Sequence, residues 1–422
     1  MKFLHDLLEK QKPLFEKGGK LEKLYYVFEA GETFMFTPPE VTKAKGVQVR
    51  DAVDLKRVMM TVVIALIPAI LFGIWNVGYQ HFLATNDAEV ASFGAQLIYG
   101  LKLALPLIIV SYAAGGAIEA AFAVFRNHPI TEGFLVTGIL IPLVVPASLP
   151  LWQIALASAF AVLIAKEVFG GVGMNILNVA LTARAFLYFA YPAQISGDKV
   201  WIEIGETAAG QAMATVDGFT GATFLGLAVE AQKVGQPVAD FVAQHAHWVQ
   251  SPAELAMTSF IGLIPGSIGE TSALMCLIGA IVLIWTKVAD YRIILSGVLG
   301  ALGMGVLLNV FAGDMQAVKD GVEGAKYFAY LDMPSYYHLI VGGFAFGIVF
   351  MATDPVSASQ TNTGKWIYGA FIGIMTVIIR VLNPAYPEGI MLAILLMNVM
   401  APLIDNYVVN ANKKRRLKRA TV

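Results

Sequence analysis

Residues 217–223 read DGFTGAT, a short polar segment that ends in a threonine hydroxyl. The pattern D-x-x-[S/T]-G-A-T arises by chance in about one in a thousand chains of this length. A plain turn followed by a helix is one interpretation, because Thr is a good N-cap. The other is a small-residue turn that presents the last hydroxyl for covalent attachment of a group. The motif residues are Asp217, Thr220, Gly221, Ala222 and Thr223.

A carboxylate lies inside the apolar run at residues 101–125. Glu119 follows the pair Gly115 and Gly116 and lies three residues from the second glycine, on nearly the same helix face. Adjacent glycines commonly allow close helix packing, whereas a charged side chain in a membrane span is costly and usually functional. An unpaired carboxylate there, roughly 10 Å from Arg126 along the axis, would stay protonated unless water or a cation reached it. We therefore interpret Glu119 as a cation-binding carboxylate.

Two further segments combine polar side chains with helix breakers. GGVGMNILN (170–178) carries Asn175 and Asn178 at helical i, i+3 spacing after a glycine cluster. These amides either cap a broken helix or bond the polar edge of a ligand, because an amide offers donors and an acceptor. ATDPVSASQTNTG (352–364) places Asp354 where Pro ends a helix. This segment is either a plain cytoplasmic loop or part of a cation path lined by carbonyl groups.

Other polar residues have plainer interpretations. Asp405 lies one turn from the basic tail, so transport and a structural ion pair both fit. Glu29 by itself is a solvated acid on an interfacial helix. HAH (245–247) lacks nearby partners for a metal ion, and we assign no metal site. Lys166 and Glu167 mark the end of a span.

Composition limits the class of protein. The chain has 422 residues, of which 57% are hydrophobic and 14% charged. A soluble domain carries about 25% charged residues, so this composition indicates an integral membrane protein. The net charge of −1 argues against nucleic acid as a partner. The single cysteine, Cys276, excludes an internal disulfide or iron–sulfur cluster, so redox chemistry would need another cofactor.

Apolar runs of about 20 residues can cross a bilayer as helices. The sequence therefore predicts an all-α polytopic membrane protein with about ten transmembrane helices. We expect these helices near residues 58–77, 101–125, 134–150, 151–170, 175–193, 272–288, 291–312, 336–353, 366–383 and 387–408. The fifth is polar at its start and is expected to be short or broken.

Loop charge predicts the orientation, because short cytoplasmic loops accumulate Lys and Arg. Residues 1–57 contain eleven Lys or Arg residues, and the C-terminal residues 409–422 contain six. Residues 194–254 contain only Lys199 and Lys233 against seven acidic residues. We therefore expect both termini in the cytoplasm and the DGFTGAT motif on the opposite side.

An internal match predicts two related halves. GILIPLVVPAS (138–148) matches GIVFMATDPVS (347–357) in its Gly-Ile, Pro and Ser positions. The match pairs the third span with the eighth, and five spans per half make the repeats inverted, with a site at the midplane. The expected divisions are a cytoplasmic amphipathic segment (1–57), a first five-helix repeat (58–193), an extracytoplasmic loop (194–271), a second five-helix repeat (272–408) and a basic cytoplasmic tail (409–422).

The whole chain resembles a known family. DGFTGAT, RDAVDLKR, YPAQISGD, FIGLIPGSIGET, ATDPVSAS and the basic tail are similar to the B subunit of sodium-translocating NADH:quinone oxidoreductases, which is related to the D subunit of Rnf-type complexes. The D subunit of an Rnf-type complex, which carries electrons between ferredoxin and NAD, is the alternative, but this subunit is expected to be shorter and to lack the long polar N-terminal extension. A passive small-solute channel is an alternative from another class, and it has no use for a flavin acceptor.

The resemblance implies specific roles. A flavin transferase would attach FMN through its phosphate to Thr223, and riboflavin would lie near Asn175 and Asn178. Quinone and inhibitor binding would involve Gly115 and Gly116. The cation path would include Glu119, Asp354, Asp405 and Glu29.

The resemblance also implies a setting. The chain would be one subunit of a six-subunit complex in the bacterial inner membrane, in contact with lipid. The complex passes electrons from NADH to ubiquinone and exports Na⁺, and this subunit is not catalytic alone. The sequence contains no G-x-G-x-x-G turn in a βαβ context, so we do not expect NADH to bind here.

Overall fold

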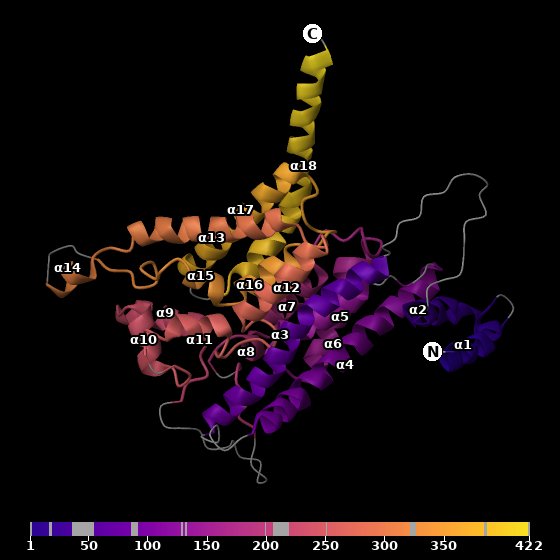
Figure 1. Ribbon diagram of the computed structural model, residues 1–422, viewed down its shortest axis with the longest axis horizontal. Helices are drawn as coiled ribbons and strands as arrows, with labels where there is room; N and C mark the ends of the chain where they lie inside the picture. Colours follow the sequence, from indigo (N-terminus) through magenta and orange to yellow (C-terminus); the bar gives the residue numbers. More distant parts are fainter. Residues whose placement is uncertain are drawn as a thin grey trace.

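The structure is a computed structural model built of helices joined by turns and loops (Figure 1). It describes residues 2–16, 19–35, 55–85, 92–127, 130, 133–198, 200–205, 219–249, 251–320, 326–383 and 386–420. Within these ranges there is no β-strand, only an isolated bridge between Gly313 and Tyr327. The expected all-α fold is confirmed.

Five helices in the described ranges are long and apolar enough to cross a membrane. They are α3 (Leu55–Ala84), α4 (Phe93–Arg126), α13 (Tyr291–Val310), α17 (Asn362–Leu382) and α18 (Ile390–Ala420). Shorter apolar helices accompany them, namely α5 (Gly133–Leu143), α7 (Val179–Ala190) and α12 (Ala273–Trp285). A polytopic membrane protein is therefore confirmed, whereas the count of ten spans, their inverted repeat and the domain divisions stay predictions.

The first half of the chain packs around α4. Helices α3, α5 and α6 (Leu151–Ala161) contact it, and α3 runs along its side (Figure 1). This approach needs glycine, because a Cβ on Gly100 would lie 1.7 Å from the Ile74 carbonyl oxygen. The buried residues of α4 recur every three or four positions between Gln96 and Ala123, and Glu119 belongs to this stripe. The helix therefore turns Glu119 towards its neighbours.

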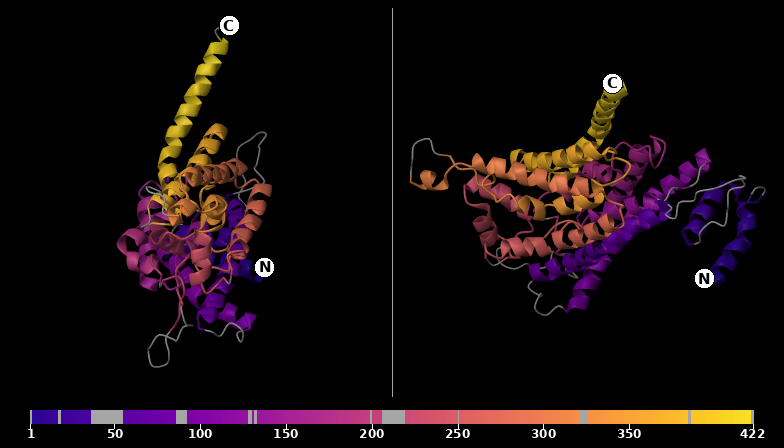
Figure 2. Two further views of the ribbon diagram at one scale, coloured as in Figure 1. Left: turned by 90° about the vertical axis from the view of Figure 1, so that its left-hand side faces the viewer. Right: turned by 45° about the horizontal axis from the view of Figure 1, so that its top comes forward.

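The second half is centred on α13 and α17, which lie side by side. A Cβ on Gly373 of α17 would lie 2.0 Å from the Gly297 carbonyl oxygen of α13, so the backbones approach closely. Helix α18 packs against α17, and its basic C-terminal part projects away from the body (Figures 1 and 2). The N-terminal helices α1 (Lys2–Phe15) and α2 (Tyr25–Met35) lie at the opposite side from α14 (Met315–Lys319) (Figure 1).

Several helices are interrupted inside the body. A continuous helix at 336–353 is a wrong prediction. Instead the chain forms α15 (Tyr337–Ile340), α16 (Phe344–Phe346) and a π-helix at Gly347–Met351. The interruption has a local cause, because Gly342 and Gly343 adopt φ of +64° and +70°, which an α-helix cannot accommodate. The expected span 134–150 is also shorter, because its helix is α5. The fifth span, at 175–193, is predicted to be short or broken, and the short helix α7 confirms this.

The segment after α7 forms a small helical layer of its own. Following α8 (Pro192–Ile195), it contains α9 (Phe224–Val234), α10 (Val238–His245) and α11 (Leu255–Ile261), which lie close together (Figure 1). Their apolar faces share a buried core with Tyr337 and Val341. The layer therefore packs the end of the DGFTGAT motif against the segment that contains Tyr337 and Val341.

Candidate functional site

The end of the DGFTGAT motif is a rigid turn at the start of α9. Asp217 lies outside the described residues. The Thr220 hydroxyl accepts a hydrogen bond from the Ala222 N–H at 3.2 Å. A Cβ on Gly221 would lie 2.2 Å from the Asp198 carbonyl oxygen, so only glycine fits there. Thr223 is the N-cap of α9, and its Oγ1 accepts from the Gly226 N–H at 3.3 Å. The N-cap interpretation is thus confirmed, and it is compatible with a further role for the hydroxyl.

Thr223 lies at the edge of a cavity of about 410 Å³. Aromatic rings form part of the wall, and the Tyr188 and Tyr386 rings meet edge to face with centroids 4.5 Å apart. The wall also contains charged residues of both signs and a further aromatic residue, namely Arg184, Asp198, Trp201, Glu230, Lys233 and Glu388. The cavity therefore offers flat aromatic surfaces together with charged groups of both signs near the hydroxyl.

A buried ionic cluster borders this cavity. The Arg184 guanidinium donates from Nη1 to both Glu270 oxygens, at 2.8 and 2.9 Å, and from Nη2 to Glu388. The Arg184 side chain is 3% exposed and that of Glu270 7%. Charge-assisted bonds of this kind satisfy charges that would otherwise be costly to bury. Our sequence reasoning missed this cluster, although an arginine in the apolar run of α7 was a signal for it.

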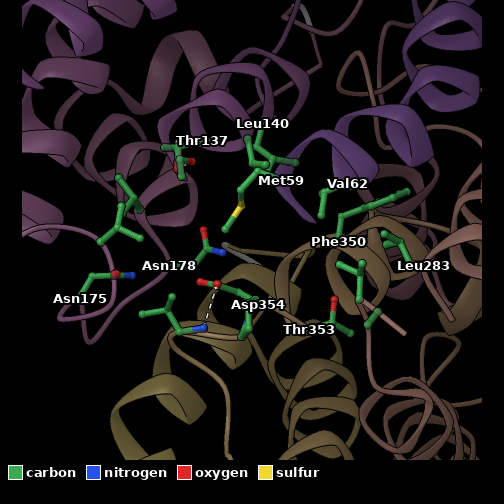
Figure 3. Close-up of a pocket in the computed structure, with 18 of the residues that line it drawn as sticks. Met59, Val62, Thr137, Leu140, Asn175, Asn178, Leu283, Phe350, Thr353 and Asp354 are labelled. Atoms are coloured by element: carbon green, nitrogen blue, oxygen red, sulfur yellow. Dashed lines mark hydrogen bonds between the residues drawn. The ribbon is translucent and has the colours of Figure 1, made fainter. Parts of the chain in front are cut away.

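A second cavity, of about 80 Å³, brings together two of the predicted sites. Asn175, Asn178 and Asp354 line it, with Met59 and Phe350 as part of its apolar wall (Figure 3). These residues come from distant parts of the chain, so the sequence alone did not place them together.

The polar groups of this second cavity are held in place. Asn178 is the N-cap of α7, and its Oδ1 accepts from the Leu181 N–H at 3.1 Å. The Asp354 carboxylate accepts from the Val356 N–H at 3.1 Å and from the Ser357 hydroxyl at 2.8 Å. The capping interpretation of Asn178 is thus confirmed, and its amide is oriented by the same contact.

Glu119 forms a buried ion pair that the sequence did not indicate. Its Oε1 accepts a hydrogen bond from the Lys166 ammonium at 2.6 Å, and the two side chains are 3% and 2% exposed. Lys166 and Glu167 do end a helical segment, the π-helix Val162–Glu167, but both are buried. The Lys166 ammonium lies 5.8 Å from the centre of the Phe134 ring and also lines the second cavity. The Glu119 carboxylate is therefore already paired with a cation of the protein itself, the Lys166 ammonium.

The two glycines before Glu119 differ in their surroundings. A Cβ on Gly115 would lie 2.5 Å from the Phe134 ring, whereas one on Gly116 would lie 3.5 Å away, an ordinary contact. Gly115 is therefore required by packing within the described chain. Gly116 has room for a small side chain, so packing against the described residues does not explain it.

The remaining predicted residues lie elsewhere. The Asp405 carboxylate accepts from the Ser359 hydroxyl at 2.7 Å and from the Gln360 N–H at 2.7 Å, and so fixes the loop that follows Asp354. Glu29 lies on α2 and lines neither cavity.

Comparison with known proteins supports one family. The family described as NQR2, RnfD, RnfE matches residues 42–414. The chain is 47% identical to the B subunit of the Na(+)-translocating NADH-quinone reductase of Ectopseudomonas mendocina, with 98% of each chain covered. It is 46% identical to the protein of the same name from Chromohalobacter salexigens, and the match covers 99% of this chain and 96% of the relative. It is also 46% identical to that of Azotobacter vinelandii, with 98% of each chain covered. The chain belongs to the NQR2, RnfD and RnfE family.

Proposed function

We propose that this chain is the membrane subunit of a sodium-translocating NADH:quinone oxidoreductase and carries electrons on two flavins. FMN is attached to Thr223, and riboflavin lies between Asn178 and Asp354. The observation that carries the proposal is the position of Thr223, whose hydroxyl closes a tight turn at the edge of a large cavity. The family relationship and the names of the relatives support the complex.

The surroundings of Thr223 suit a phosphoester. The hydroxyl stands at the N-terminus of α9, where backbone N–H groups and the helix dipole favour a phosphate. Arg184 and Lys233 lie on the cavity wall together with the carboxylates of Asp198, Glu230 and Glu388, and the aromatic rings offer flat faces for an isoalloxazine ring. FMN supplies reversible electron transfer when bound, while the chain holds the phosphate and shields the ring.

The experiment for this step compares two threonines. Thr223→Ala should abolish covalent flavin, whereas Thr220→Ala should leave the acceptor hydroxyl in place. Intact-protein mass, together with in-gel fluorescence after denaturation, measures the attachment. A Thr223→Ala chain that still gains the mass of one FMN contradicts the proposal. Absence of flavin in the wild-type chain favours the small-solute channel.

The second cavity suits riboflavin in its chemistry. Asn175, Asn178 and Asp354 can bond the ribityl hydroxyls and the polar ring edge, and Met59 and Phe350 face the ring. Methionine can move to admit a larger group, because its side chain is flexible. Asn178→Leu should therefore lower the riboflavin released from the denatured complex while FMN on Thr223 remains.

The wider setting belongs to the same proposal. Ubiquinone takes up electrons near Gly115 and Gly116, and Na⁺ export follows a path that includes Glu119, Asp354, Asp405 and Glu29. Partners are the other subunits of a six-subunit complex, a flavin transferase and membrane lipid. Both termini lie in the cytoplasm of a bacterium, with the protein in the inner membrane. The near-complete coverage of the sodium-translocating relatives favours this over the Rnf-type D subunit.

A further inference from the structure

A small cavity lies where three breaks in the helices meet. Its volume is about 30 Å³, and a single water needs about 10–15 Å³ by the same measure. It is lined by the segment 264–271 between α11 and α12, by Gly342 and Gly343 between α15 and α16, and by Glu388 just before α18. Thr223 lines it as well. The cavity therefore has room for about two waters or one small ion.

Oxygen atoms of several kinds face this space. A Cβ on Gly343 would lie 2.9 and 3.0 Å from the two Glu270 oxygens, so the carboxylate rests directly against the helix break. Thr271 is 5% exposed, and its hydroxyl has no hydrogen-bond partner among the described residues. A buried hydroxyl without a partner is costly. Its position on the cavity wall leaves space beside it for a partner, either a water or an ion.

The charges around the cavity balance without a ligand. Arg184 pairs with both Glu270 and Glu388. The Arg380 guanidinium donates to the carbonyl groups of Val341 and Gly342 at 2.9 and 3.0 Å. Two cations thus face two carboxylates. A phosphoester on Thr223 would add one negative charge, which a monovalent cation would neutralise.

We propose that this cavity is a Na⁺ site that fills when Thr223 carries its phosphoester. The Glu270 and Glu388 carboxylates and the Thr271 hydroxyl supply the oxygen ligands, the donor type that hard cations prefer. Ion sites at interrupted membrane helices use the same combination of side chains and unwound backbone. The site rests on the proposed function, because the phosphoester supplies the balancing charge and Na⁺ is the transported ion in the names of the relatives.

The test uses the assembled complex and the Thr271 hydroxyl. Na⁺-dependent stabilisation is measured as the midpoint of thermal unfolding at constant ionic strength, with choline replacing Na⁺. Thr271→Val should raise the Na⁺ concentration for half of the effect roughly tenfold, the loss expected for one uncharged oxygen ligand. Thr271→Ser should keep the wild-type curve. The matched control is Ser259→Ala, which removes another buried hydroxyl that has no partner among the described residues and does not line this cavity.

Two outcomes overturn the site. An unchanged Na⁺ curve in Thr271→Val means that the cavity holds only water. An equal shift in Ser259→Ala means that hydroxyl loss acts through general stability. Intact-protein mass tests the proposed flavin separately, because it asks only whether Thr223 is modified. If wild-type Thr223 carries FMN, Thr223→Ala should weaken Na⁺ stabilisation, and a retained wild-type curve refutes the link between phosphoester and cation.

Discussion

Breaking the Glu119–Lys166 pair should destabilise the protein more than removing the pair altogether. The two groups are 2.6 Å apart, and neither side chain is more than 3% exposed. Removing one partner leaves the other charge buried, which costs about 3–5 kcal/mol, whereas replacing both by apolar groups of similar size is often close to neutral. Glu119→Leu and Lys166→Met should therefore each lower the stability by this amount, and the double variant should recover most of it.

The assay is equilibrium unfolding of the purified chain in detergent, arranged as a double-mutant cycle. The control is Lys102→Met, which removes an exposed lysine from the same helix, α4. If each single variant costs less than about 1 kcal/mol, as surface pairs do, the pair is solvated and the reasoning fails.

A second experiment tests the proposed role of Glu119 in cation uptake by measuring the rate of quinone reduction at increasing Na⁺ concentration. Glu119→Ala should raise the Na⁺ needed for half of the maximal rate, with Glu119→Asp intermediate, and an unshifted curve returns Glu119 to a structural role.

Three further predictions concern other parts of the chain. Gly115→Ala should destabilise the protein and displace Phe134, whereas Gly116→Ala should fold normally. Equal stability of these two variants would contradict the packing. Gly116→Leu should slow quinone reduction while the flavin content stays unchanged. Burial lowers the pKa of His247 to about 4, below its ordinary value of about 6.5. The unfolded chain therefore binds this proton more tightly, and stability should fall as the pH drops from about 6.5 towards 4. His247→Phe should remove this dependence of stability on pH. The measurement is thermal unfolding across that pH range, and a wild-type unfolding temperature that does not change with pH would contradict the prediction. A reporter active only outside the cytoplasm should be silent when fused after Val422, and an active fusion would reverse the orientation.

The sequence by itself determined the class of the protein and many of its local features. Apolar runs of about 20 residues form helices in a bilayer, because a helix satisfies each backbone polar group inside its own segment. The N-cap roles of Thr223 and Asn178 were readable because capping depends on residues three positions apart. The buried placement of Glu119 followed from its position within an apolar run.

Tertiary structure decided which polar groups meet. Glu119 pairs with Lys166, 47 residues away, and Asn178 shares a cavity with Asp354. Such partners depend on how helices pack and cross, which local periodicity does not encode. The same holds for Arg184, Glu270 and Glu388, which belong to three segments and meet only because helix interruptions converge on one place. Local residue patterns fix the helices and their caps, whereas charges buried between helices are paired by the packing of the whole chain.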